Sequence, residues 1–147
     1  RYLKPRYPDL KLVGVDVQGS VIFDPDPAPY KMTGIGLSFR PPNLDYSSIH
    51  SAYVVPENLA YSMCNALARQ EGLLLGSSTG AIVAAGLHLA GTLPTGSRIA
   101  MINPDRGDRY LETIYNQDWL DDNGFVLIPP EHMDVAIEQL APYESPR

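Results

Sequence analysis

Leu73–Thr92 reads LLLGSSTGAIVAAGLHLAGT, and this stretch decides how the rest of the sequence is interpreted. Between Ala81 and Ala90 it has no charged residue, which predicts a buried helix. Just before this helix, Gly76–Gly80 places two serines and a threonine between two glycines. Such a loop offers hydroxyl groups and free backbone N–H groups at the mouth of the helix.

The hydroxyl groups of this loop have several possible roles. Ser78 or Thr79 could be an N-cap, which contributes about 1 kcal/mol to a helix. The loop could instead bind an anion at the helix N-terminus, or donate a hydroxyl hydrogen to the ring nitrogen of a cofactor. A nucleophilic serine is a weaker interpretation, because the preceding strand is weak and no histidine can be named as its base.

Strand-like and helix-like segments alternate along the chain, which predicts an α/β fold with a mainly parallel sheet flanked by helices. The expected strands are Lys11–Val17, Ser51–Pro56, a very short one at Leu73–Leu75, Ser97–Asp105, and a short strand or extended arm from Gly124. The expected helices are Pro56–Glu71, Ala81–Ala90, Gly107–Tyr115 and about Pro130–Leu140, and residues 141–147 are expected to fray. Ligands of such folds bind beyond the carboxyl ends of the strands, so we expect three loops to converge there. They are Gly34-Ile35-Gly36, Gly76–Gly80 and Pro104–Asp108.

Composition narrows the class of protein. The 147 residues make about one domain, and the net charge of −6 argues against a nucleic-acid partner. No apolar run reaches the roughly 18 residues that a membrane helix needs. The single cysteine, Cys64, excludes an internal disulfide and is interpreted as a buried small hydrophobe, so we expect a reducing, cytoplasmic location. The three histidines have no metal-ligand spacing, and we expect no metal site.

Four segments in order resemble one known family. ARQEGLLLGSSTGAIVAA resembles the R.EGLL.G.SSG...AA segment of the cysteine synthase and cystathionine β-synthase family, the fold-type II (tryptophan synthase β-like) pyridoxal-phosphate enzymes. The other three segments are RYLKPRYPDLKLVGVD, YKMTGIGLSFRPPNLD and RIAMINPDRGDRYLETIYNQDWL, so that the resemblance runs from about Arg1 to Leu120. It implies pyridoxal 5'-phosphate as cofactor, small amino-acid substrates and a homodimer.

The resemblance also implies a role for particular residues. Ser78 takes the position of the serine that donates a hydrogen bond to the pyridine nitrogen, where a neutral hydroxyl favours loss of a β-leaving group over transamination. Gly34, Ile35 and Gly36 match the loop that closes over the bound substrate. Asp105 lies beside the ring-nitrogen end as a cofactor-binding candidate, with a helix cap as the alternative role.

The residues that the family uses for catalysis are not expected in this sequence. The chain opens without methionine, and we interpret residues 1–147 as the C-terminal part of a longer enzyme. The Schiff-base lysine should lie upstream, since Lys4, Lys11 and Lys31 are not in its sequence context. Alone, the chain is expected to be inactive.

Two further segments narrow the expected reaction. VGVDVQGSVIF and PDRGDRYLETIYNQDWL resemble a branch of the family that serves siderophore biosynthesis more than they resemble ordinary cysteine synthases. That branch implies β-replacement on O-phospho-L-serine or O-acetyl-L-serine, with L-glutamate as the nucleophile, on the way to 2,3-diaminopropionate. The alternatives are a cysteine synthase that uses sulfide and, in another class, a non-catalytic anion-binding module.

Overall fold

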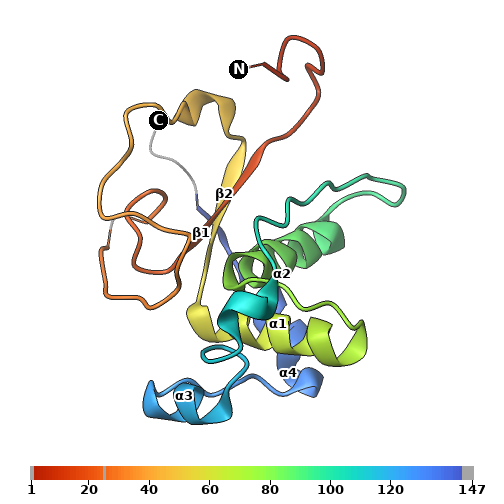
Figure 1. The fold of residues 1–147 in the computed structure, drawn as a ribbon. Coiled ribbons are helices and arrows are strands. Elements are labelled where there is room, and N and C mark those ends of the chain that lie inside the picture. Colours follow the sequence, from red (N-terminus) through yellow and green to blue (C-terminus); the bar gives the residue numbers. More distant parts are fainter. Residues whose placement is uncertain (1, 25, 144–147) are drawn as a thin grey trace.

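The computed structural model describes residues 2–24 and 26–143 and confirms the α/β class. Helices cover a small sheet, as Figure 1 shows. The elements in chain order are β1 (Val13–Val17), β2 (Ser51–Val55), α1 (Glu57–Gln70), α2 (Ser77–Thr92), α3 (Gln117–Asp122), α4 (Pro130–Glu138) and β3 (Pro142–Tyr143), with single 3₁₀ turns at Tyr46–Ser48 and Gly107–Tyr110.

The sheet has the order β1-β2-β3. Strands β1 and β2 run parallel, with Val13 opposite Ser51, whereas β3 pairs antiparallel with β2. The expectation that residues 141–147 fray is therefore wrong for Pro142 and Tyr143, because both pair with β2 and so have backbone partners. Residues 144–147 lie outside the described part of the chain.

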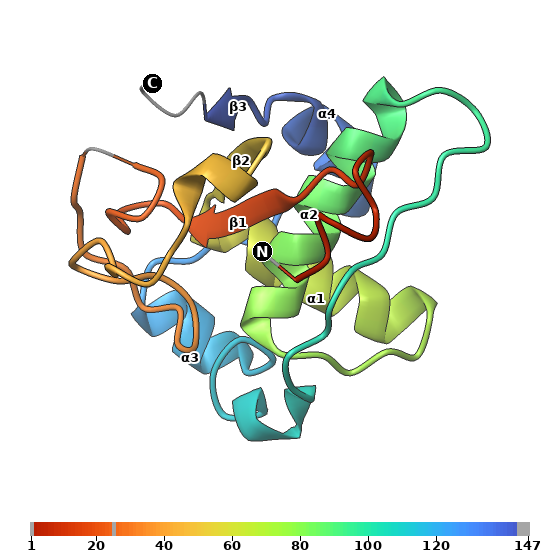
Figure 2. The ribbon, with the colours of Figure 1, turned by 90° about the horizontal axis from the view of Figure 1, so that it is seen from above.

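Helices α1 and α2 pack beside each other, and α2 also contacts β1 and β2 (Figure 2). The apolar character of α2 is explained by this position, since Ala81 and Ala84 are fully buried. Cys64 on α1 is buried too, and burial raises the pKa of its thiol to about 11. Its Sγ donates to the Gly76 carbonyl at 3.4 Å, so this cysteine is a packing residue, as the sequence indicated.

The expected strand Ser97–Asp105 is not a strand in the structure. Its backbone pairs with no other strand in the described residues, and only an isolated bridge joins Leu75 to Arg106. The expected short strand at Leu73–Leu75 is likewise reduced to that bridge. A strand needs a hydrogen-bonded neighbour, and Ile102 in the middle of the segment is 79% exposed.

The expected helix Gly107–Tyr115 is also wrong, because the helix proper starts later. A single 3₁₀ turn covers Gly107–Tyr110, and α3 begins only after Asn116. The Asn116 side chain accepts hydrogen bonds from the backbone N–H groups of Asp118 and Trp119 and is therefore the N-cap. The expected helices at Pro56–Glu71 and Pro130–Leu140 are confirmed as α1 and α4.

Candidate cofactor site at the start of α2

The hydroxyl loop is the first turn of α2. The helix begins at Ser77, with Gly76 as its N-cap, so neither Ser78 nor Thr79 caps it. The expected start at Ala81 is therefore four residues late. Ser77, Ser78 and Thr79 are 1%, 5% and 4% exposed, which places polar side chains in the interior at the positive end of a helix dipole.

The three buried hydroxyls differ in their partners. Thr79 donates to the side-chain oxygen of Asn103 and therefore has a structural role. Within the described residues, the Ser77 hydroxyl has no hydrogen-bond partner, and no hydrogen bond joins the Ser78 side chain to another residue. Buried hydroxyls without partners are costly, so this turn is suited to a polar ligand.

The backbone of residues 105–107, in the irregular segment after α2, holds the start of α2 in place. The backbone N–H of Gly76 donates to the Asp105 carbonyl at 3.1 Å, and that of Gly107 donates to the Leu74 carbonyl at 3.0 Å. The expected convergence of Gly76–Gly80 with Pro104–Asp108 is therefore confirmed.

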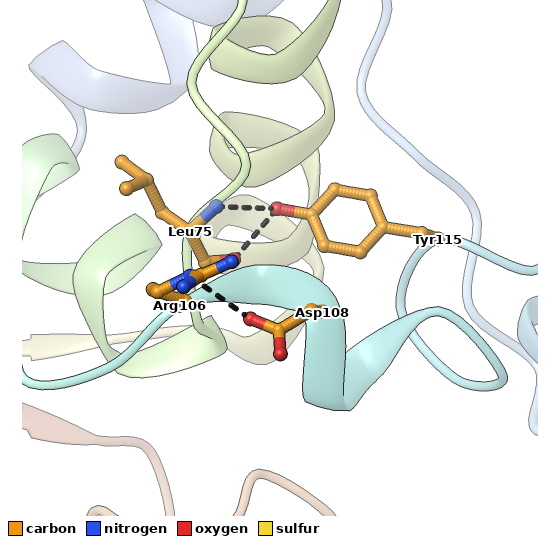
Figure 3. Close-up of polar contacts among 4 residues, drawn as sticks. All are labelled: Leu75, Arg106, Asp108 and Tyr115. Carbon is orange, nitrogen blue, oxygen red and sulfur yellow. Dashed lines mark hydrogen bonds and ion pairs between the residues drawn. The ribbon is translucent and has the colours of Figure 1, made fainter.

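Tyr115 fixes the residue before Gly76, as Figure 3 shows. Its hydroxyl accepts from the Leu75 N–H at 3.2 Å and donates to the Leu75 carbonyl at 2.6 Å. The nearby ion pair between Arg106 and Asp108, 3.3 Å long, lies at the surface and contributes little. The site therefore depends on the tyrosine hydroxyl rather than on the ion pair.

Asp105 supplies the one carboxylate of the site. Its Oδ2 accepts a hydrogen bond from the Tyr110 hydroxyl at 2.7 Å, while Oδ1 is buried and has no partner among the residues that the structure describes. Asp105 does not cap the following 3₁₀ turn, whose N-cap is Arg106. A Cβ on Gly76 would overlap the Asp105 carboxylate, so only glycine allows this close approach.

Thr33, the residue before the third predicted loop Gly34-Ile35-Gly36, influences the pKa of Tyr110. Burial and the Asp105 carboxylate raise the pKa of Tyr110, while the nearby hydroxyls of Thr33 and Ser77 lower it in part. Tyr110, which sequence reasoning did not select, lies against Asp105 and Gly76, whereas the convergence of Gly34-Ile35-Gly36 with the other two loops stays a prediction.

The end of β1 carries a buried carboxyl group. Asp16 is 1% exposed, its Oδ1 accepts from the Val17 N–H at 2.9 Å, and its Oδ2 has no partner in the described residues. Burial raises its pKa above the ordinary 3.8, opposed in part by the Ser20 hydroxyl and the N–H groups of Val17 and Phe23. The folded chain therefore binds a proton that the unfolded chain releases at lower pH.

Replacing Asp16 with asparagine should change how stability depends on pH. The stabilising contribution of protonated Asp16 is complete below pH 3.8 and is lost as the pH rises through its raised pKa. Asp16→Asn keeps the oxygen that accepts from Val17 and removes the buried charge. It should raise the unfolding free energy at pH 7.5 by about 1 kcal/mol and leave it unchanged near pH 3.5. Thermal unfolding at both pH values, with the exposed Asp9→Asn as control, checks this; a larger gain at pH 3.5 would contradict it.

The residues present fit a pyridine-type cofactor ring. A ring nitrogen accepts a hydrogen bond, and the first turn of α2 offers two hydroxyl donors, Ser77 and Ser78, that have no hydrogen-bond partner among the described residues. Among residues 2–24 and 26–143 no three His, Cys, Asp or Glu side chains gather as metal ligands. Within the same residues, no helix has the length and apolarity to cross a bilayer.

Comparison with known proteins decides the family. Residues 1–105 match the family of pyridoxal-phosphate dependent enzymes. The chain belongs to this family. Proteins of this family use pyridoxal 5'-phosphate, which agrees with the donor set at the start of α2.

Individual members of the pyridoxal-phosphate family give closer likenesses. A cysteine synthase of Helicobacter pylori is 40% identical over 111 residues, which cover 76% of this chain and 36% of that protein. The crystal structure of an O-acetylserine dependent cystathionine β-synthase from Helicobacter pylori matches at 42% identity and a TM-score of 0.71, over 79% of this chain and 38% of that one. The structure of an O-ureido-L-serine synthase matches at 29% identity and a TM-score of 0.71, over 81% of this chain and 40% of that one. The chain thus spans 36–40% of the length of these relatives.

Proposed function

We propose that this chain is the C-terminal part of a pyridoxal-phosphate-dependent enzyme that catalyses β-replacement on an activated serine. The observation that carries the proposal is the first turn of α2, where the Ser78 side chain has no hydrogen bond to another described residue and lies next to the buried Ser77 hydroxyl, which also has no partner there. Hydroxyl groups without protein partners are suited to a ligand acceptor. The lysine that binds the cofactor is then supplied by polypeptide upstream of Arg1, and the chain alone is inactive.

In this proposal, each residue of the site has a defined task. Ser78 donates its hydroxyl hydrogen to the pyridine nitrogen and, being neutral, does not hold a proton there. The cofactor, when bound, withdraws electrons from the substrate, and an unprotonated ring does so weakly enough to favour expulsion of the β-substituent. Asp105 and Tyr110 keep the first turn of α2 in position through the carbonyl bond to Gly76. Gly34-Ile35-Gly36 encloses the substrate and excludes water.

The donor substrate is proposed to be O-phospho-L-serine or O-acetyl-L-serine. One structural relative is named as O-acetylserine dependent, and this supports the substrate class. The branch-specific segments, Val13–Phe23 and Pro104–Leu120, support L-glutamate as nucleophile. The product would be N-(2-amino-2-carboxyethyl)-L-glutamate, and the protein a synthase of siderophore 2,3-diaminopropionate biosynthesis, cytoplasmic and homodimeric.

A second candidate function is sulfide-dependent cysteine synthesis. The 40% identical relative from Helicobacter pylori is named a cysteine synthase, which favours it. A non-catalytic anion-binding module is less well supported, because the Asp105 carboxylate lies against Gly76 at the start of α2 and would repel an anion.

A nucleophile competition separates the two enzymatic functions. The full-length protein, loaded with pyridoxal 5'-phosphate, is given O-phospho-L-serine or O-acetyl-L-serine with glutamate or sulfide, and the products are measured by mass spectrometry. We expect the glutamate adduct to form with a kcat/KM about 100-fold above that for cysteine formation, a difference of roughly 2.7 kcal/mol. Cysteine as the dominant product would support the second function, and no product with either nucleophile would overturn both.

A further inference from the structure

The Gly34-Ile35-Gly36 loop is fixed on its N-terminal side by one carboxylate. Glu57, the first residue of α1, accepts three hydrogen bonds on Oε1: from the backbone N–H groups of Lys31 and Met32, each at 2.7 Å, and from the Tyr61 hydroxyl at 2.8 Å. Hydrogen bonds to an ionised acceptor are short and about twice as strong as neutral ones. Glu57 also lies in the first turn of α1, where a negative side chain interacts favourably with the helix dipole.

Tyr61 keeps this arrangement intact across the physiological pH range. Its side chain is 1% exposed, and burial, with Glu57 beside it, raises the pKa of its hydroxyl. The hydroxyl therefore stays protonated and donates to Glu57 throughout. The buried phenol and the two backbone amides together orient the carboxylate.

The C-terminal side of the loop is fixed by a buried hydroxyl. Ser20, fully buried after β1, accepts from the Leu37 N–H at 3.0 Å and donates to the Leu37 carbonyl at 3.3 Å. The Val21 N–H also donates to the Leu37 carbonyl, at 3.0 Å. Leu37 is thus held through both of its backbone polar groups.

Only residues 33–36 lie between these two anchors. Gly34 and Gly36 have φ angles of +80° and +83°, and Ile35 packs against the core between them. The conformation of so short a segment is determined by the positions of its two ends. Any shift of Met32 relative to Leu37 therefore moves the loop that the proposed function places over the substrate.

We propose that Glu57 is a positioning residue for substrate binding, which acts through the backbone of Lys31 and Met32. The inference rests on the proposed function, because it assigns the loop to the substrate. Glu57 touches neither cofactor nor substrate: its task is to hold the loop in the binding-competent conformation. Its loss lowers the population of that conformation and so weakens substrate binding, while the cofactor contact at Ser78 is unaffected.

The test compares Glu57→Ala with Glu57→Gln, which retains an acceptor oxygen, and with Glu71→Ala, an exposed glutamate just after α1, as control. In the full-length holoenzyme, Glu57→Ala should raise KM for the serine substrate about tenfold and change kcat less than threefold. Amide hydrogen exchange at residues 31–37 should speed up about tenfold without substrate, while the visible absorption of the bound cofactor stays unchanged. Glu57→Gln should restore most of both properties, and Glu71→Ala should match the wild type.

Three results would overturn the proposal: unchanged exchange at residues 31–37 in Glu57→Ala, accelerated exchange throughout the molecule, or Glu57→Gln as impaired as Glu57→Ala. A lowered kcat at unchanged KM would also contradict it, because that pattern indicates a role in the chemical step. The exchange measurement does not require an active protein. If the full-length protein were inactive, the proposed function would be refuted, but hydrogen exchange would still show whether Glu57 anchors the loop.

Discussion

Ser78→Asp in the full-length protein is expected to lower turnover on the order of 100-fold or more and to leave the fold intact. Ser78 is 5% exposed, so a carboxylate there must be desolvated and would favour a protonated ring nitrogen as its partner. A protonated ring withdraws electrons more strongly than an unprotonated one, and the cofactor is then less suited to β-replacement. Ser78→Ala removes one hydrogen bond, worth about 1–3 kcal/mol, and should cost roughly 5–150-fold.

Steady-state kinetics, circular dichroism and thermal unfolding of the Ser78 variants check this expectation. Ser97→Ala is the matched control, because the Ser97 hydroxyl donates to the Pro94 carbonyl in an exposed loop. If Ser78→Ala lost stability and kept wild-type turnover, the hydroxyl would be a structural group and the cofactor assignment would be wrong.

Gly36→Ala is expected to cause the second large effect, a loss of stability together with weakened substrate binding. Gly36 has a φ of +83°, which costs an L-residue about 1–2 kcal/mol. Its new Cβ would lie 2.7 Å from the Tyr30 hydroxyl and 2.8 Å from Val17 Cγ1, which adds about 1–3 kcal/mol of overpacking. The sum, about 2–5 kcal/mol, lowers the unfolding midpoint by at least roughly 4 °C.

Gly34→Ala is the matched control for this prediction. Gly34 has a similar φ of +80°, but a Cβ there would meet nothing within 4 Å. It should cost only the conformational term of about 1–2 kcal/mol. Thermal unfolding and the KM for the serine substrate are measured for both variants. If Gly36→Ala and Gly34→Ala lost the same stability, crowding against Tyr30 and Val17 would not be significant.

The parts of the fold predicted correctly from sequence are those with a strong local pattern. Helix α1 follows from apolar residues at four-residue spacing with a proline before it, and α4 from a similar pattern after a Pro-Pro pair. The sequence predicts a start of α2 that is four residues too late, because serine and threonine disfavour helix interiors. Burial of this turn against the rest of the chain overrides that preference.

The site was predicted in part for a similar reason. The roles of Ser78 and of the glycine loop come from the resemblance to the family, and their convergence is an expectation from the fold class. The groups that hold them could not be predicted in this way, because the contacts are distant in sequence: Tyr115 binds Leu75 across 40 residues and Glu57 binds Met32 across 25. The periodicity of apolar residues along the sequence does not indicate which distant residues form these contacts. The polar aromatic residues after Gly107 were the one signal that could have pointed to Tyr110.

The position of the Ser78 hydroxyl relative to the cofactor tests the central claim most directly. A crystal structure of the full-length protein with pyridoxal 5'-phosphate should place Ser78 Oγ within about 2.7–3.0 Å of the pyridine nitrogen. It should also show Asp105 bonded to Tyr110 and not to the ring. A carboxylate on the ring nitrogen, or a cofactor bound away from the first turn of α2, would contradict the account.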